Sequence, residues 1–129
     1  MNKLLWIKIT AVCGVLAVAL GAFAAHGLKA HISPQSMATY QTGIQYQVFH
    51  CLALLAIINL PLDQQRLLWV ARSFLLGIIL FSGSLYIIAL SGIGAIGIIT
   101  PVGGVAFICG WLLLFTAKAQ NRNSKNDGN

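Results

Sequence analysis

The alternation of long apolar segments with short polar ones is the feature that most constrains this chain. Four segments carry almost no charge: residues 9–28, 43–60, 67–90 and 98–117. Each is close to the roughly 20 residues that an α-helix needs to cross about 30 Å of hydrocarbon. Helices are expected, because a strand with an open edge would leave backbone groups unpaired in lipid. We predict an all-α integral membrane four-helix bundle, formed by a single domain over residues 1–117.

The charge content agrees with a lipid environment. Charged residues make up 8% of the chain, against roughly 25% in soluble domains. The net charge of +6 could suggest an anionic partner. However, the basic residues flank the apolar segments and are not interleaved with aromatic residues. We therefore expect the lipid bilayer, and no nucleic acid, as the main partner.

The distribution of Lys and Arg predicts the orientation. With a cytoplasmic amino terminus, Lys29 is the only basic residue on the outer side, and seven lie inside. The inner residues are Lys3, Lys8, Arg66, Arg72, Lys118, Arg122 and Lys125. Because positive residues concentrate in cytoplasmic loops, both termini should face the cytoplasm of a multi-pass protein in the bacterial plasma (inner) membrane. Arg72 lies near enough to the interface for its head group to snorkel outward.

The first segment has an alternative interpretation as a secretory signal peptide. Lys3 and Lys8 precede it, and Ala22-Phe23-Ala24 has the small-x-small form of a cleavage site. The apolar run is longer than the usual 7–15 residues. Its small residues Gly14 and Gly21 suit close helix packing. We therefore favour a retained helix.

The polar connections differ in character. Ser33 followed by Pro34 is typical of a helix start, so a short interfacial helix is possible after the first span. The connection at residues 91–97 is uncharged and contains three glycines, which favours a tight turn in the membrane interface. Residues 118–129 are rich in Asn and Lys, so we predict a disordered cytoplasmic tail.

Polar residues within the apolar segments gather in the predicted outer half. Gln47 is one of the polar residues near the start of the second segment. The candidate polar cluster consists of His26, Gln41, Gln45, Tyr46, His50, Ser82, Ser84, Tyr86 and Thr100. An unpaired polar group is costly in hydrocarbon, so these side chains should face one another. They could line a chamber for a ligand or protons, but hydrogen bonding between helices is the favoured interpretation.

Small residues form a second pattern. Gly14, Gly21, Gly83, Pro101, Gly103 and Gly104 are the candidates for close helix packing. Thr100 and Pro101 begin the fourth segment, where proline is tolerated because the first N–H groups of a helix are unpaired anyway. A free helix terminus could also hold an anionic head group, but packing is the favoured role.

The residue types argue against catalysis and metal binding. Asp63 and Asp127 are the only acids, and both lie outside the apolar segments. No carboxylate is therefore available in a span to orient a histidine for nucleophilic chemistry or to relay protons. Cys13, Cys51 and Cys109 lack the paired short spacing of a zinc site and are interpreted as small buried hydrophobes. We expect no enzyme activity, no metal and no cofactor.

Several motifs resemble the YgdD/YwdK-like family of small inner-membrane proteins. They are GAFAAHG at residues 21–27, YQTG at 40–43, YQVFH at 46–50, FSGSLY at 81–86 and TPVGG at 100–104. The similarity covers about residues 4–117. Ala24 departs from the pattern, in which glycine is expected, but a small residue is retained. The resemblance implies four spans and an inner-membrane location, and it implies no reaction.

These observations lead to two functional hypotheses. The favoured one is a non-enzymatic accessory or self-associating helical bundle, present as a homo-oligomer or within a larger membrane complex. The alternative is a binding or permeation protein for a small solute, a lipid or protons, acting through the polar cluster.

Overall fold

A computed structural model describes residues 1–119 of the chain as four helical stretches. The first comprises α1 (Lys3–Phe23) and the π-helical turn η1 (Ala24–Leu28), and the second is α2 (Pro34–Ile57). The third comprises α3 (Gln64–Gly77), the π-helical turn η2 (Ile78–Ser82) and α4 (Gly83–Ser91). The fourth comprises the 3₁₀ helix η3 (Gly94–Ile98) and α5 (Ile99–Phe115). The described residues contain no strand, which confirms the all-α prediction.

Three of the four stretches are long and apolar enough to cross a membrane. They are Lys3–Leu28, Gln64–Ser91 and Gly94–Phe115. The second stretch, α2, has the length of a span at 24 residues. It is less apolar, because Gln41, Gln45 and Gln47 lie along it.

Side-chain caps explain where three of the helices begin. Asn2 accepts a hydrogen bond from the backbone N–H of Leu5 at 3.1 Å. Ser33 accepts one from Ser36 at 3.1 Å, and Asp63 accepts one from Arg66 at 2.7 Å. Each cap satisfies an N–H group that has no partner within the helix. The predicted helix start at Ser33 and Pro34 is therefore confirmed.

Two local expectations need correction. The residues after Pro34 form no separate interfacial helix, because α2 runs through Gly43 to Ile57 without a break. The Gly-rich connection is not a simple turn. Gly92, with a φ of 70°, ends α4, and residues 94–98 then form the 3₁₀ helix η3.

The start of the predicted tail is paired with the loop between α2 and α3. The backbone N–H of Asp63 donates to Lys118 O at 3.0 Å, and Leu62 forms an isolated antiparallel bridge with Ala119. Ordered contacts therefore continue to the last described residue. The remainder of the predicted tail, residues 120–129, lies outside the described part of the chain.

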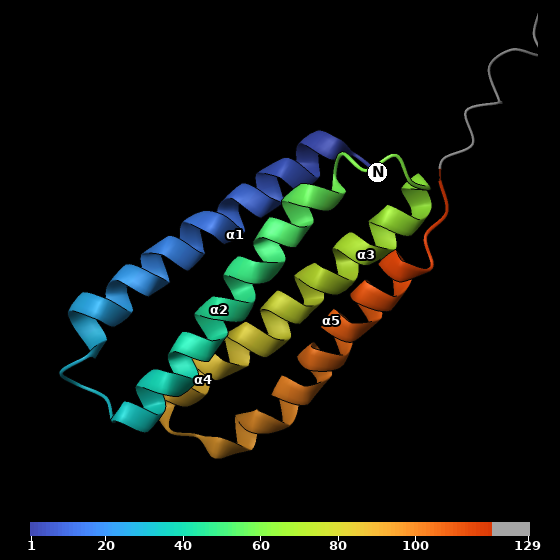
Figure 1. Ribbon diagram of the computed structural model, residues 1–129. Coiled ribbons are helices and arrows are strands. Elements are labelled where there is room, and N and C mark those ends of the chain that lie inside the picture. The colour runs from blue at the N-terminus through green and yellow to red at the C-terminus, as the bar shows by residue number, and fades with distance from the viewer. Residues whose placement is uncertain (120–129) are drawn as a thin grey trace, which may run out of the picture.

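The helices lie side by side in the order α1, α2, α3 with α4, then α5 (Figure 1). The amino terminus lies near the α2–α3 loop (Figure 1). Among the long helices of the described chain, only α2 has its backbone close to that of α1, while the α1 side chains of Trp6 and Cys13 reach the shared core. The α5 helix packs mainly on α3 and η2, so α1 and α5 occupy opposite edges of the bundle.

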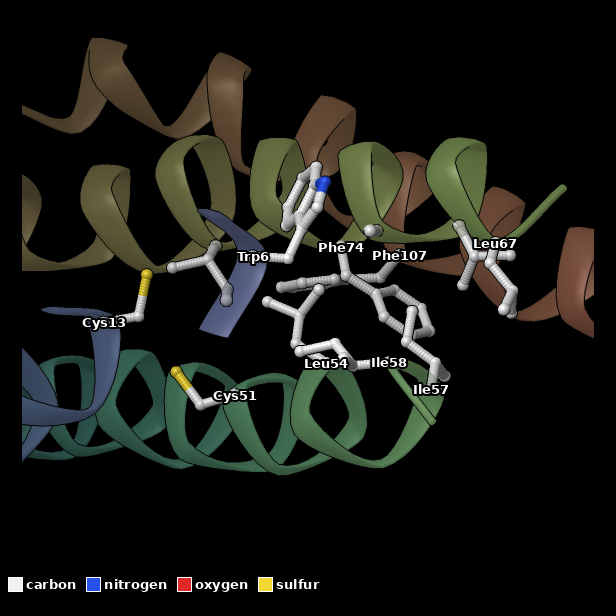
Figure 2. Close-up of a cluster of buried hydrophobic side chains, with 12 residues drawn as sticks. Trp6, Cys13, Cys51, Leu54, Ile57, Ile58, Leu67, Phe74 and Phe107 are labelled. Atoms are coloured by element: carbon white, nitrogen blue, oxygen red, sulfur yellow. The ribbon is translucent and has the colours of Figure 1, made fainter. Parts of the chain in front are cut away.

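The main apolar core lies where residues of α1, α2, α3 and α5 meet (Figure 2). Leu54, Leu67 and Phe74 are each fully buried there. A smaller cluster joins Ala24, Leu28, Tyr40 and Ala89 near the other ends of the helices. Ala24, which replaces the expected glycine of the family motif, is therefore a buried packing residue.

Close helix contacts occur at only some of the predicted glycines. A Cβ on Gly103 would meet the backbone of Phe81, and one on Gly104 would touch the Phe81 ring at 3.8 Å. A Cβ on Gly14, Gly21 or Gly83 would meet nothing within 4 Å, so these glycines make no close packing contact within residues 1–119. Pro101 is exposed. For these four residues, close helix packing stays a prediction.

Other glycines take the expected packing role. They are Gly43 against Tyr86, Gly77 against Phe107 and Gly110 against Phe74. Each faces an aromatic ring of another helix. The absence of a side chain thus makes room for a large one.

Candidate functional site

The buried face of α2 organises the polar residues. Its buried positions include Tyr40, Gly43, Gln47, His50 and Leu54, which are spaced three and four residues apart. This spacing defines a single helical face. The polar groups that α2 places in the interior of the bundle therefore come from Tyr40, Gln47 and His50.

Gln47 links three helices. Its side-chain Nε2 donates to Cys13 O of α1 at 2.8 Å. Its Oε1 accepts from the Tyr86 hydroxyl of α4 at 2.7 Å. Tyr40 adds a second link to α1, because its hydroxyl donates to Leu20 O at 3.2 Å. The side chains of Gln47, Tyr40 and Tyr86 thus find partners for polar groups that would otherwise be unpaired in an apolar environment.

A second polar contact joins α4 and α5. The hydroxyl groups of Ser84 and Thr100 lie 2.7 Å apart, and Ser84 also donates to Phe81 O at 2.9 Å. Ser82 is fully buried within the π-helical turn η2, and its hydroxyl has no partner in the described residues. Ser82 is therefore brought into the interior without joining the hydrogen-bonded network.

His50 is held in a box of aromatic rings. Its Nδ1 donates to Tyr46 O at 2.9 Å, and its Nε2 accepts from Trp111 Nε1 at 3.2 Å. The imidazole stacks on Phe107 with ring centroids 3.5 Å apart and an interplanar angle of 10°. One nitrogen donates and the other accepts, which is the pattern of the neutral ring. Both nitrogens are occupied within the protein.

A groove lies beside this box, between α2 and α5. Side chains bridge these two helices, while their backbones remain apart. The cavity has a volume of about 570 Å³. Its lining residues are Gln45, Tyr46, Phe49, His50, Phe81, Gly104, Phe107, Ile108 and Trp111. Gln45, Phe49 and Ile108 are exposed, so the groove opens on the outer surface of the bundle.

The predicted polar cluster is divided between these locations. His50, Ser82 and Ser84 are buried, and Tyr86 and Thr100 join the internal hydrogen bonds. Gln45 and Tyr46 line the groove. The exposed His26 and Gln41 lie outside both the hydrogen-bonded network and the groove. Their positions reflect the helix faces that carry them: Gln41 is next to the buried Tyr40 but points away from the interior.

Several central residues were absent from the predicted cluster. Gln47 lies at its centre, and Tyr40, Phe107 and Trp111 complete its packing. The signal for Gln47 was its place in the three-and-four spacing that runs from Tyr40 through His50. Gln41 and Gln45 are exposed and lie on another face of α2.

The cysteines also separate by environment. Cys13 and Cys51 are buried in the main core, where they lie on α1 and α2 (Figure 2). Cys109 is exposed on α5. The interpretation as a buried hydrophobe is therefore wrong for Cys109, because its helix face points away from α3.

The comparisons with known proteins all point to the same family. The model of the family described as "Protein of unknown function (DUF423)" matches residues 20–104. A UPF0382 membrane protein of Staphylococcus haemolyticus is 40% identical over 111 residues, which cover 85% of this chain and 91% of the relative. The UPF0382 membrane protein YwdK of Bacillus subtilis is 41% identical over 115 residues, covering 87% and 94%.

A further relative carries a location in its name. The UPF0382 inner membrane protein YgdD of Escherichia coli is 44% identical over 109 residues, which cover 81% of each chain. No solved structure matches the chain. The match to the family model and the similarity along most of the length agree with the membrane-crossing character of the helices. The chain therefore belongs to the DUF423/UPF0382 family of membrane proteins.

Proposed function

We propose that this protein is a non-enzymatic membrane protein that binds a small lipid-soluble molecule in the groove between α2 and α5. The observation that carries the proposal is the cavity of about 570 Å³ lined by six ring-bearing side chains. Ligand pockets in proteins commonly measure roughly 300–1,000 Å³ and are mostly apolar with a few polar groups. The groove has this character, and it opens on the surface of the bundle.

The internal polar residues support a structural role beside this groove. Gln47, Tyr86 and His50 have their hydrogen-bonding groups engaged by other parts of the protein. The Nε2 atom of His50 accepts from the Trp111 indole N–H, which does not ionise, so its lone pair is not free to take up a proton. The helices also bring no carboxylate to it, since Asp63 lies in a loop. These features favour binding over catalysis and over proton permeation.

The proposed topology has four membrane crossings and both termini in the cytoplasm. Its support is the charge distribution, in which Lys29 is the only basic residue on the opposite side. The length of α2 and its position between α1 and α4 favour a fourth crossing. In this arrangement the groove faces the lipid, and ligands reach it from within the bilayer. The inner membrane is the proposed location, as for the relative YgdD.

Native mass spectrometry of the full chain in mild detergent tests the proposal. The wild type should retain a small lipid-soluble molecule, and Gly104→Leu should lose it because the new side chain fills the groove. A Cβ at Gly104 meets only ordinary contacts, at 3.8 Å from the Phe81 ring. The matched control is Gly83→Leu, since Gly83 is also helical but lies outside the groove. Equal retention by Gly104→Leu and the wild type would refute binding in this groove.

Self-association through α1 is a second candidate function. The α1 helix lies at an edge of the bundle, and the face that it turns away from α2 has a shallow hollow of about 510 Å³ around Gly14 and Val18. Small residues allow another helix to approach closely in a membrane. We expect an oligomer in mild detergent that Gly14→Leu disrupts. Recovery of the wild type only as a monomer without a partner would contradict this candidate.

A further inference from the structure

The chemistry of the groove narrows the class of ligand, on the assumption that the proposed binding function is correct. We infer that the occupant is a lipid-soluble quinone, a flat ring that carries carbonyl oxygens and an apolar tail. Three features of the groove support this choice: the depth of its polar groups, their free hydrogen-bonding capacity and the aromatic character of its walls. The inference concerns binding alone and includes no redox step.

The first feature is the depth of Gln45. This residue follows Pro34 by 11 positions and precedes Ile57 by 12, so it lies at the middle of α2. At about 1.5 Å per residue, it is roughly 17 Å from either helix end. This distance matches about half the thickness of the hydrocarbon layer. In a membrane-crossing α2, the Gln45 amide therefore lies inside the hydrocarbon layer, away from water at either helix end.

The second feature is the free hydrogen-bonding capacity at the opening. Neither the Gln45 amide nor the Tyr46 hydroxyl has a hydrogen-bond partner in residues 1–119, although both line the groove. Both groups are donors. Polar groups in hydrocarbon require a partner, and the carbonyl oxygens of a quinone can accept from both. The acyl chain of a phospholipid could fill the groove but could not pair with these donors.

The third feature is the shape of the walls. The Tyr46 ring packs against Phe81 with centroids 4.5 Å apart and lies 6.1 Å from Phe107. Phe49 and Trp111 form another pair, at 5.9 Å. Aromatic faces prefer offset or edge contacts with other flat rings. The walls thus offer several ring contacts to a planar head group, while the open side leaves a path for its tail into the lipid.

His50 is not expected to contact the carbonyl oxygens of the quinone. Its Nδ1 and Nε2 are already engaged by Tyr46 O and Trp111 Nε1. The specific contacts are consequently limited to Gln45 and Tyr46. Gln41, four residues before Gln45 on the same helix, is also exposed but does not line the groove. It therefore supplies a matched control.

Titration of the full chain with decylubiquinone in mild detergent tests the inference, with tryptophan fluorescence as the readout. Trp111 lines the groove, so a bound quinone should quench its emission in a saturable way. Gln45→Leu should weaken binding by about tenfold, as expected for the loss of one hydrogen bond. Tyr46→Phe should also weaken quinone binding. Gln41→Leu should leave the affinity within about twofold of the wild type.

The outcomes separate this inference from the proposed function. Non-saturable quenching, or equal quinone affinity of the Gln45→Leu and Gln41→Leu variants, would refute the assignment of a quinone as the ligand. If Gly104→Leu instead removes a co-purified phospholipid, the groove binds a lipid-soluble molecule and only the quinone assignment fails. If Gln45→Leu turns an oligomer into a monomer without a change in quenching, the groove is a contact between copies and the inference fails. Unchanged unfolding temperatures for these variants are the control for folding.

Discussion

Replacement of Gly103 by alanine tests a close contact between the backbones of two helical elements. Gly103 is buried on α5 and faces the backbone of Phe81 in η2. An alanine Cβ would lie only 2.8 Å from Phe81 Cα, and it would also meet the Phe81 backbone nitrogen. These atoms belong to the backbone and cannot rotate away. The α5 helix and η2 would therefore have to move apart, which would also weaken the other contacts between them.

The neighbouring Gly104 provides a direct comparison. The nearest atoms to a Cβ there belong to the Phe81 ring, at 3.8 Å and 3.9 Å, which is ordinary contact. Both glycines lie in the interior of α5, so both alanine variants gain about the same helix propensity, at most about 1 kcal/mol. Overpacking typically costs about 1–3 kcal/mol. Because the propensity gain cancels in the comparison, Gly103→Ala should be less stable than Gly104→Ala by about 1–3 kcal/mol.

The free energy of unfolding can be measured for both variants in mixed micelles by titration with a denaturing detergent, with helicity as the signal. We expect Gly104→Ala to match or slightly exceed the wild type and Gly103→Ala to unfold at a lower denaturant fraction. Equal stability of the two variants would refute the reasoning, because it would mean that α5 and η2 do not approach closely at this point.

Three other predictions concern the polar network and the topology. Gln47→Leu should lower the free energy of unfolding by about 1–3 kcal/mol in the same assay, because the hydroxyl of Tyr86 loses its acceptor; a change smaller than that of an exposed control such as Gln41→Leu would contradict this. His50→Phe should cost about 1 kcal/mol, since a ring can still stack on Phe107, whereas His50→Ala should cost about 3 kcal/mol by leaving a cavity; equal losses would argue against the aromatic box. In intact cells, a cysteine introduced by Ser33→Cys should react with a membrane-impermeant maleimide and one introduced by Asn2→Cys should not, and the reverse pattern would invert the proposed orientation.

The helical content could be predicted from the sequence because it depends on local properties. Uninterrupted apolar segments predict helices, and the Ser33 and Pro34 pair predicts where α2 begins. The bounds differ by several residues at some ends. For example, α1 starts at Lys3 with Asn2 as its cap, although the apolar segment begins later. Charged residues at a helix end do not interrupt hydrogen bonding, so hydropathy alone underestimates helix length.

The composition of the site could be predicted only in part, because it depends on which helices are neighbours. Gly14 and Gly43 have the same local chemistry, yet a Cβ on Gly43 would meet Tyr86, whereas one on Gly14 would meet nothing within 4 Å among the described residues. The order of the helices decides this difference, and that order is not encoded in any single segment. Likewise, the groove requires α2 and α5 to be bridged by side chains while their backbones remain apart. The sequence could indicate polar residues on α2, but not the aromatic residues of α5 that would meet them.

The attachment of α1 follows from the same arrangement. Among the long helices of the described chain, only α2 has its backbone close to that of α1, so α1 lies at an edge of the bundle. Two hydrogen bonds from α2, donated by Gln47 to Cys13 O and by Tyr40 to Leu20 O, join the two helices directly. Gln47 also accepts from Tyr86, so the residue that secures α1 is itself positioned by α4. The polar residues of α2 therefore serve two separate purposes: Gln47 and Tyr40 hold the edge helix, while Gln45 and Tyr46, on another face, remain free for the groove.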